Sequence, residues 1–221
     1  DLGNTSSSVG ASIGISVFPT DGLDVDALIK FADSAMYQVK SGGKNYFSFS
    51  TDDMRQQRTR QLELERCLRD AMGANEFAIH YQPQVDLRSG LVVGFEALLR
   101  WHSSELGSVT PEEFIPIAED TGLIIPLGHW LLREVCQQAA SWRRSGLPAL
   151  RLAVNVSPLQ FTHPDFIGHV KQAVRDAGML PNSLELEITE GLLLQDNELV
   201  FKTLQRLRRL EIRTTLDDFG T

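Results

Sequence analysis

An α/β fold built on parallel strands is predicted from three features of the sequence. From residue 63 onward, short runs of β-branched and apolar residues alternate with segments of helical periodicity. The strand signals recur at intervals of about 30 residues, which is the length of one strand-helix unit. The composition, 42% hydrophobic and 23% charged over 221 residues, is typical of a globular protein with a sizeable core.

Residues 1–52 form a smaller α/β segment at the start of the chain. Residues 8–19, SVGASIGISVFP, alternate small and β-branched side chains and predict a strand. Residues 24–40 carry apolar side chains at helical spacing, and residues 46–50, YFSFS, alternate like one further strand. About fifty residues bury too little apolar surface to form a comfortable core alone.

The chain becomes polar at residues 53–62, which we interpret as a linker that begins a connecting helix. A second domain then spans residues 63–221. Its first helix is amphipathic, and the apolar face is marked by Leu64, Cys67, Leu68 and Met72.

The second domain is predicted to open with a pair of strands at residues 76–87 and 91–101. Two helices follow, the first of which has Thr110 as its N-cap and Pro111 as its first helical residue. Strands and helices then take turns: strands at 150–157, 183–190 and 212–218, and helices at 163–179 and 196–210.

Each of these strands has one apolar and one polar face, because side chains alternate along a strand. In SLELEITE, Glu185 and Glu187 share a face. Two carboxylates on an interior face cost free energy unless a cation or hydrogen-bond donors meet them. The same alternation places five other residues on the polar faces of their strands: Glu96, Leu98, Arg100, Asn155 and Asp217.

The spacing of these oxygen-bearing residues predicts that they meet. Asn155 and Glu187 are 32 residues apart, and Glu187 and Asp217 are 30 apart, so each interval is about one repeat. Such residues lie at the same level of successive strands, towards the carboxyl ends where barrel enzymes carry their active sites. Oxygen ligands without His or Cys select a hard cation such as Mg²⁺ or Mn²⁺. The adjacent Asp217 and Asp218 suit two ions, with one of the two carboxylates bridging them.

Other interpretations of single carboxylates stay open. Asp217 or Asp218 alone fits a helix cap, for which Asp is favoured. Glu187 alone fits a pairing with Arg at a strand edge, and Glu185 is expected to form a structural salt bridge. The in-phase set as a whole favours the metal site.

Charge and cysteine content limit the classes of partner. A formal charge of −8 argues against broad binding of DNA or RNA, yet permits a small phosphorylated ligand or metal ions held locally. No apolar run approaches the roughly 20 residues of a membrane helix, and no signal peptide opens the chain. Two isolated cysteines, Cys67 and Cys136, give little support to a disulfide framework or zinc site. A cytoplasmic location is therefore expected.

Several ordered motifs carry a resemblance to a known family. YQPQVDL…GFEALLRW, TPEEFIPIAEDTGLI, NVSPLQF, LELEITE and LDDFGT together resemble the EAL family of cyclic di-GMP phosphodiesterases, over roughly residues 60 to 221. ASIGISVFP…ADSAMYQVKSGGKN similarly resembles the last third of a GGDEF diguanylate cyclase domain. The resemblance implies an incomplete TIM-like barrel of about five strands, the first antiparallel, preceded by a partial GGDEF domain.

The EAL resemblance also implies roles for individual residues. The implied reaction hydrolyses one phosphodiester of cyclic di-GMP to linear pGpG, with water activated by two Mg²⁺ or Mn²⁺ ions, in bacterial second-messenger signalling. A phosphate-binding role for Arg100 is also expected on chemical grounds, apart from the resemblance, since a guanidinium is suited to phosphate. The implied metal ligands are Glu96, Asn155, Glu187, Asp217 and Asp218, of which Glu96, Asp217 and Asp218 are also catalytic, and the implied substrate contacts are Gln82, Leu98 and Arg100.

The chain also departs from the family pattern. That pattern continues beyond LDDFGT with a lysine near the attacking water and a further metal-binding glutamate, so we expect this chain to be a piece of a longer protein and inactive alone. The GGDEF signature loop is absent from it, which leaves cyclase activity unassigned. The family often has Gly at the position of Glu211, a difference expected to matter only to the turn.

Two other functions are weighed against the phosphodiesterase. One is a receptor that binds cyclic di-GMP without cutting it, as degenerate EAL-like domains do. The other is an interaction module that only transmits a signal to a partner and binds no nucleotide. The resemblance leaves a homodimer open, because EAL relatives commonly dimerise, and this segment is expected to make no membrane contact.

Overall fold

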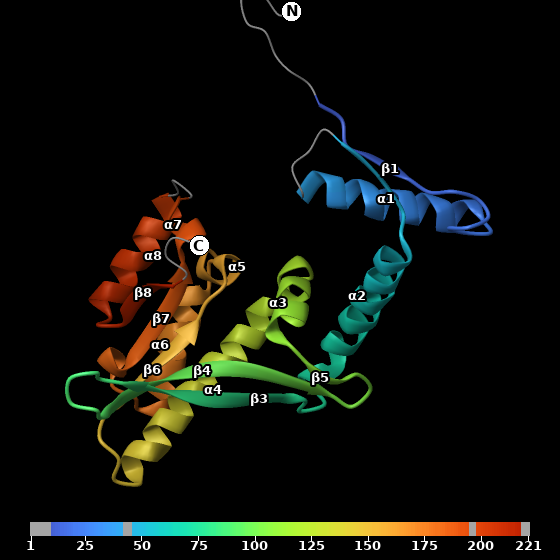
Figure 1. The fold of residues 1–221 in the computed structure, drawn as a ribbon. Coiled ribbons are helices and arrows are strands. Elements are labelled where there is room, and N and C mark those ends of the chain that lie inside the picture. Colours follow the sequence, from blue (N-terminus) through green and yellow to red (C-terminus); the bar gives the residue numbers. More distant parts are fainter. Residues whose placement is uncertain (1–9, 42–45, 195–197, 218–221) are drawn as a thin grey trace, which may run out of the picture. The chain divides into compact units, whose positions relative to one another are not determined.

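A computed structural model of the protein describes residues 10–41, 46–194 and 198–217 (Figure 1). The chain divides into two compact units, Asp1–Leu64 and Glu65–Thr221. The boundary between them falls inside a single helix, α2 (Asp52–Ala71). Each unit is described by itself below.

In its described part, the first unit contains the beginning of α2 and one helix packed on two short parallel strands. Helix α1 (Val25–Ser41) contacts β1 (Ile13–Ile15) and β2 (Phe47–Phe49), and Ile13 pairs with Phe47. Strand and helix approach closely at Gly14, where an added Cβ would lie 1.7 Å from the carbonyl oxygen of Ala32. A glycine is required there because any side chain would push α1 off the strand.

The second unit contains a mixed sheet with the strand order β3-β4-β6-β7-β8, and β5 pairs with β4. Strand β3 runs antiparallel to β4, whereas β4, β6, β7 and β8 are parallel to one another. The prediction of an α/β fold whose first strand is antiparallel is therefore confirmed. The strands are β3 (Phe77–Val85), β4 (Val92–Ser103), β5 (Gly107–Val109), β6 (Arg151–Asn155), β7 (Leu184–Thr189) and β8 (Arg213–Asp217).

Helices cover the apolar face of this sheet. Three long helices lie side by side, α4 against β6 and α6, α6 against α8, and α8 against β8. Beneath them the side chains of Leu152, Leu184 and Leu186 are 0% exposed. The helices are α3 (Pro111–Asp120), α4 (Ile124–Arg144), α5 (Pro158–Phe161), α6 (Phe166–Ala177), the 3-10 turn η1 (Pro181–Ser183), α7 (Glu190–Leu194) and α8 (Glu198–Arg209).

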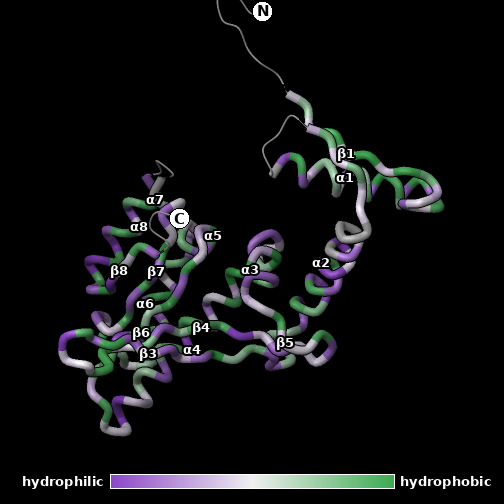
Figure 2. Tube along the Cα trace, in the orientation of Figure 1, coloured by the Kyte–Doolittle hydropathy of each residue, from purple (hydrophilic) through white to green (hydrophobic). Residues whose placement is uncertain are grey.

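Hydropathy along the chain follows this arrangement. Figure 2 shows hydrophobic colouring along β6 and β7 and long hydrophilic stretches in α2 and α8. A buried strand needs apolar residues along its length, whereas a surface helix needs them only on one stripe. Within the part of the chain that the structure describes, no helix has the length and apolar character needed to cross a bilayer.

An aromatic cluster fixes the end of the β3–β4 pair. Trp101 is 2% exposed and meets Phe114 of α3 edge to face, with 5.7 Å between ring centroids. Phe77 lies 6.0 Å from each of these rings. Helix α3 starts at Pro111 as predicted, and the Glu113 carboxylate accepts a hydrogen bond from the Thr110 N–H at 3.3 Å.

Helix α5 is seated on α4 by a close contact at a glycine. The Ser157 Oγ accepts the Gln160 N–H at 3.3 Å, and the Gln160 Oε1 accepts the Ser157 N–H at 3.1 Å, which is a reciprocal capping arrangement. The Gln160 side chain rests on Gly128 of α4, where an added Cβ would lie 1.5 Å from its Nε2. Because α5 begins three residues after Asn155, this contact supports the loop that follows that residue.

Two features were not predicted. Strand β5 forms a short hairpin on β4, in a stretch where the sequence has no strand-like alternation. Glu211, in the turn before β8, has φ = 61°, the left-handed conformation that favours glycine. The family's frequent glycine at this position now has a physical reason.

Candidate active site

The carboxyl ends of the parallel strands bring the predicted ligands to one face of the sheet. Asn155 and Glu187 are register partners on β6 and β7. Glu187 also pairs with Thr215, so Asp217, two residues further along β8, lies on the same face. Glu96 pairs with Ala153, two residues before Asn155, and joins that face from β4.

Glu96 and Asn155 are in direct contact. The Asn155 Nδ2 donates a hydrogen bond of 2.8 Å to the Glu96 Oε1. The two residues are 59 positions apart in the sequence and meet because β4 and β6 are neighbours. This bond orients the Glu96 carboxylate beside the Asn155 amide, so one ligand could meet oxygen atoms from both.

Negative charge accumulates around Glu187. Burial, followed by the charges of Glu96, Asp217 and Glu185, raises the pKa of the Glu187 carboxyl to about 7 from its ordinary 4.5. Like charges have this effect only when they lie close together. A cation among these carboxylates would remove the repulsion, and a set of oxygen donors alone fits a hard divalent ion.

Glu185, two residues earlier on the same face, already has a cationic partner. Its Oε2 accepts a hydrogen bond from the Arg151 Nη1 at 3.3 Å, which makes a salt bridge between β6 and β7. Its Oε1 accepts another from the Thr215 hydroxyl. The structural salt bridge predicted for Glu185 is confirmed, and it separates Glu185 in role from Glu187.

The predicted substrate contacts lie beside this set. Gln82 is the register partner of Glu96 on β3 and is exposed. Leu98 and Arg100 are half-buried and follow Glu96 on the same face of β4. The Arg100 Nη1 donates to the carbonyl of Leu99 at 2.9 Å, which leaves most of the guanidinium donors for a ligand.

Part of the predicted site is not described. Asp218 lies outside the described residues. Among residues 10–41, 46–194 and 198–217, no three His, Cys, Asp or Glu side chains are already arranged to hold a metal ion. Asn155 and Asp217 are exposed, so the polar face is more open to solvent than a sheet covered on both sides would be. The ligand and catalytic roles of Glu96, Asn155, Glu187, Asp217 and Asp218 stay predictions.

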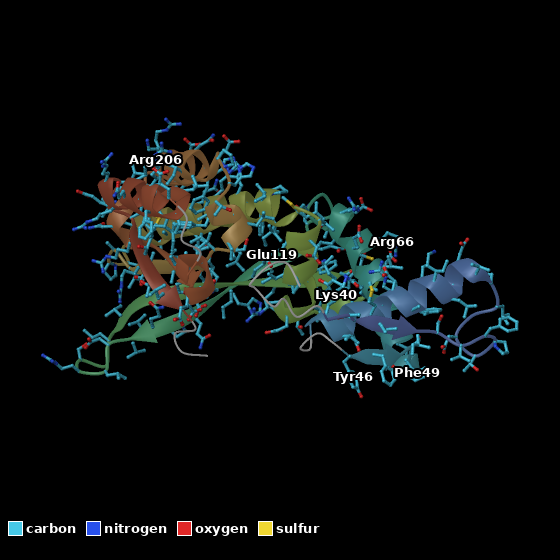
Figure 3. The ribbon with its side chains drawn as sticks, turned by 90° about the horizontal axis from the view of Figure 1, so that it is seen from above. Lys40, Tyr46, Phe49, Arg66, Glu119 and Arg206 are labelled. Atoms are coloured by element: carbon cyan, nitrogen blue, oxygen red, sulfur yellow. The ribbon has the colours of Figure 1, made fainter. Side chains whose placement is uncertain are left out.

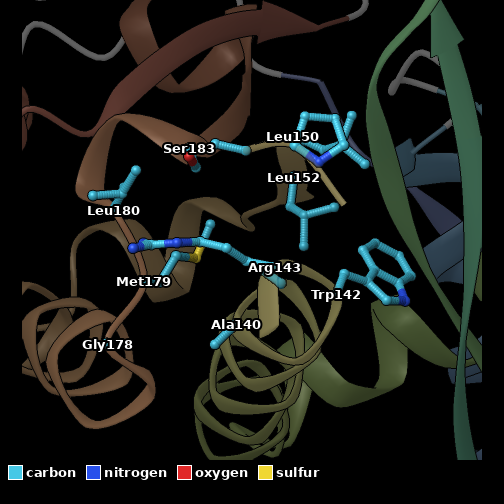
Figure 4. Close-up of a pocket in the computed structure, with 12 residues that line it drawn as sticks. Ala140, Trp142, Arg143, Leu150, Leu152, Gly178, Met179, Leu180 and Ser183 are labelled. Atoms are coloured by element: carbon cyan, nitrogen blue, oxygen red, sulfur yellow. The ribbon is translucent and has the colours of Figure 1, made fainter. Parts of the chain in front are cut away.

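A pocket at the other end of the sheet is not a candidate for phosphodiester chemistry. It lies between the end of α4, the start of β6 and the segment before β7 (Figure 4). Its lining is mostly apolar, as with Trp142, Leu152 and Met179, and includes no carboxylate. It sits at the amino ends of the parallel strands, opposite to the ligand set.

No sequence pattern pointed to one carboxylate that contacts β4, that of Glu76. The Glu76 Oε2 accepts a hydrogen bond from the Trp101 Nε1 at 3.0 Å. Its Oε1 accepts from the Ser104 N–H at 2.9 Å and from the Ser104 hydroxyl at 2.6 Å. These bonds lower the pKa of the Glu76 carboxyl. The partners are 25 and 28 residues away, beyond the reach of any local pattern.

Comparison with known proteins decides the family. Residues 65–221 match the EAL domain, and residues 1–46 match the diguanylate cyclase, GGDEF domain. The chain belongs to the EAL domain family. Phosphodiesterases of this family generally depend on divalent metal ions.

Several curated relatives are similar over nearly the whole chain. A signaling protein of Caulobacter vibrioides is 40% identical over 96% of this chain and 26% of its own length. The bifunctional diguanylate cyclase/cyclic di-GMP phosphodiesterase MucR of Pseudomonas aeruginosa is 38% identical, over 96% and 31%. The cyclic di-GMP phosphodiesterase PdeR of Escherichia coli is 39% identical, over 95% and 32%. The chain thus spans about a quarter to a third of these relatives.

Solved structures of EAL proteins share the fold. The MucR phosphodiesterase in complex with c-di-GMP superimposes with a TM-score of 0.69 at 38% identity, covering 72% of this chain and 64% of that one. The EAL enzyme Bd1971, with cAMP and cyclic-di-GMP bound, gives a TM-score of 0.70 at 27% identity, covering 91% and 53%. The TIM-like architecture implied by the sequence is therefore confirmed.

Proposed function

We propose that this chain carries the metal- and substrate-binding residues of a cyclic di-GMP phosphodiesterase. The observation that carries the proposal is the polar face on which Glu96, Asn155 and Glu187 meet, with Arg100 further along the same strand as Glu96. Membership of the EAL family and the similarity to MucR, which was solved as a c-di-GMP complex, support it.

Two divalent cations, Mg²⁺ or Mn²⁺, are the cofactors that this face would accept. Its metal-binding atoms are all oxygens, and a bound cation would favour the ionised form of Glu187, whose pKa burial and neighbouring carboxylates raise to about 7. Bound there, such ions supply an activated water nucleophile and neutralise charge on the phosphate. The residues proposed to hold them are Glu96, Asn155, Glu187, Asp217 and Asp218.

The chain's own side chains bind and orient the substrate in this proposal. Arg100 presents a fork of N–H donors that matches two oxygens of a phosphate. Gln82, opposite Glu96 on β3, offers an amide to the substrate from the neighbouring strand. Leu98 provides an apolar contact between Glu96 and Arg100. Asn155 keeps the Glu96 carboxylate in place through its Nδ2 bond.

The proposed reaction adds one water molecule across one phosphodiester of cyclic di-GMP. The water oxygen bonds to phosphorus, one ester P–O bond breaks, and the water proton completes the freed hydroxyl of linear pGpG. Glu96, Asp217 and Asp218 are the proposed catalytic residues because they match the positions that carry this role in the EAL family pattern.

Hydrolysis by the full-length protein tests this proposal. With Mg²⁺ or Mn²⁺ present, the protein should convert cyclic di-GMP to pGpG, followed by chromatography, and Glu96→Ala should abolish turnover. Glu198→Ala is the matched control, because this exposed carboxylate on α8 pairs only with Lys202 among the contacts described. Unchanged turnover in Glu96→Ala would refute the assignment.

Calorimetry separates the enzyme from a receptor. Binding of cyclic di-GMP without formation of pGpG would replace the phosphodiesterase by a non-catalytic receptor. A cytoplasmic location completes the proposal, and export-dependent reporter fusions test it. A homodimer is the assembly that the resemblance suggests, and sedimentation velocity of the full-length protein tests that part separately.

A further inference from the structure

The two halves of β4 are held in different ways. Residues 94–97 pair with β3 on one side and with β6 on the other, so Glu96 is fixed between two strands and by Asn155. Beyond Ala97 the pairing with β6 ends. Residues 98–100 are paired with β3 alone, and the last residues of the strand, Trp101–Ser103, pair with β5.

Arg100 is held by few side-chain contacts, although its charge also acts on the Glu112 carboxylate at the start of α3. Its guanidinium bonds to the carbonyl of the preceding residue, and none of the described carboxylates forms a salt bridge with it. The next residue, Trp101, points to the opposite face, where it is buried against Phe77 and Phe114. The orientation of Trp101 therefore sets the direction in which Arg100 leaves the strand.

Glu76 holds this half of β4 from outside the sheet. Its carboxylate accepts the Trp101 Nε1–H and both donors of Ser104, and its carbonyl accepts the His102 N–H at 2.9 Å. A single residue in the turn between α2 and β3 thus bonds to three of the four residues that follow Arg100. Hydrogen bonds to a charged carboxylate are among the stronger ones in proteins.

Helix α2 is tied to the same turn by a second carboxylate. The Arg66 guanidinium, which projects from α2 (Figure 3), pairs with Glu105 through two bonds, Nη1 to Oε1 at 3.1 Å and Nη2 to Oε2 at 2.5 Å. Such paired bonds fix both distance and orientation. This exposed pair links the end of α2 to the turn after β4.

We propose that Glu76 is a positioning residue for Arg100: by holding Trp101 and Ser104 it sets where the Arg100 guanidinium meets a substrate phosphate. Arg66 and Glu105 connect α2 to this arrangement, so a movement of α2 would change how Arg100 contacts the substrate phosphate. Glu96 and its metal-binding partners, held by β6, would be little affected. This inference rests on the proposed function for the role of Arg100 but not for the geometry.

Steady-state kinetics of the full-length protein test the inference. In Glu76→Ala, KM for cyclic di-GMP should rise roughly tenfold. The kcat and the Mn²⁺ concentration for half-maximal activity should stay within about twofold of the unsubstituted protein. Glu65→Ala is the matched control, since this α2 carboxylate pairs with Arg69 within its own helix and should leave all three values unchanged.

A double-mutant cycle shows whether Glu76 acts through Arg100. If it does, Glu76→Ala should add no further rise in KM when Arg100 is already Ala. Trp101→Phe removes the Nε1 donor and keeps an aromatic ring in the cluster, although a smaller one, so it should raise KM by a smaller factor. If urea titrations show that Glu76→Ala folds poorly, the KM of Trp101→Phe still tests the inference.

Results that contradict the inference differ from those that contradict the proposed function. Equal changes in kcat, KM and Mn²⁺ requirement, or a full additional loss in the Arg100→Ala background, would overturn the inference and leave Glu76 a general structural residue. Normal KM in both Glu76→Ala and Trp101→Phe would do the same. Failure of the proposed function looks different, because the unsubstituted protein would then neither hydrolyse nor bind cyclic di-GMP.

Discussion

Replacing Glu187 by Gln should stabilise the metal-free protein above pH 7. In the folded chain the Glu187 carboxyl is partly buried and faces the negative charges of Glu96, Asp217 and Glu185. An amide of the same size keeps the packing and removes one of the repelling charges. The variant should therefore unfold at higher urea concentration than the unsubstituted protein when no divalent ion is present.

The size of the effect follows from the pKa of the Glu187 carboxyl, about 7 in the folded chain against 4.5 ordinarily. At about 1.4 kcal/mol per tenfold change in proton affinity, full ionisation costs the folded state at most roughly 3 kcal/mol. Solvent screening at a half-exposed carboxylate reduces this to about 1 kcal/mol.

The direction of the pKa shift determines the pH range in which protonated Glu187 stabilises the protein. Folding raises this pKa, so the stabilising contribution of the protonated Glu187 is fully present below pH 4.5 and is lost as the pH rises through 7. Glu187→Gln should accordingly exceed the unsubstituted protein in stability at pH 8 and match it at pH 4. The difference between the two proteins should grow across that interval.

Urea unfolding in EDTA, followed by tryptophan fluorescence, measures this difference. All three tryptophans, Trp101, Trp130 and Trp142, belong to the second unit, so the signal reports on the unit that carries Glu187. Glu185→Gln is the matched control, because it lies two residues away on the same face. It should destabilise by about 1 kcal/mol through loss of its charged hydrogen bonds.

Two results would refute the reasoning about Glu187. One is a pH dependence that is the same in Glu187→Gln and in the unsubstituted protein. The other is a variant that is less stable at pH 8 by as much as the Glu185→Gln control. Adding Mg²⁺ gives an internal check, because an ion bound among the carboxylates should stabilise the unsubstituted protein and have less effect on the variant.

Three further outcomes are expected from burial and backbone geometry. Leu186→Ala should destabilise the second unit by about 3 kcal/mol, because Leu186 is 0% exposed, and an unchanged urea midpoint would contradict its place in the core. Glu211→Gly should stabilise by about 1 kcal/mol in thermal unfolding by relieving the left-handed conformation, and a loss of stability would count against that strain. Burial raises the pKa of the Cys136 thiol to about 12, so iodoacetamide at pH 8 should label it only after unfolding; mass spectrometry of the native protein showing rapid labelling would disprove this.

The sequence predicted the parallel part of the second unit well because its signals are local. Alternation in SLELEITE and in RLAVNVS is complete within each strand, and the structure has strands at Leu184–Thr189 and Arg151–Asn155. The same alternation put Glu96, Asn155, Glu187 and Asp217 on one face before any pairing was known. The start of α3 was equally predictable, since Thr110 as N-cap and Pro111 as first helical residue are both local signals for a helix start.

The features that escaped prediction depend on distant partners. Glu76 is one acidic residue in a polar turn until β3 and β4 pair and bring Trp101 and Ser104 beside it. Glu185 was expected to pair, yet Arg151 could not be named, because the register of β6 against β7 decides it. Glu211 shows its left-handed backbone only once the turn before β8 is formed.

The contact between Gly128 and Gln160 couples the side chains that these two positions can carry during evolution. With Gln160 in place, even a methyl group at position 128 would occupy the space of its amide nitrogen. Position 160, in contrast, can be shortened first, since the glycine tolerates an empty neighbour. A side chain at position 128 is thus expected to require that Gln160 be shortened or turn its amide away from α4.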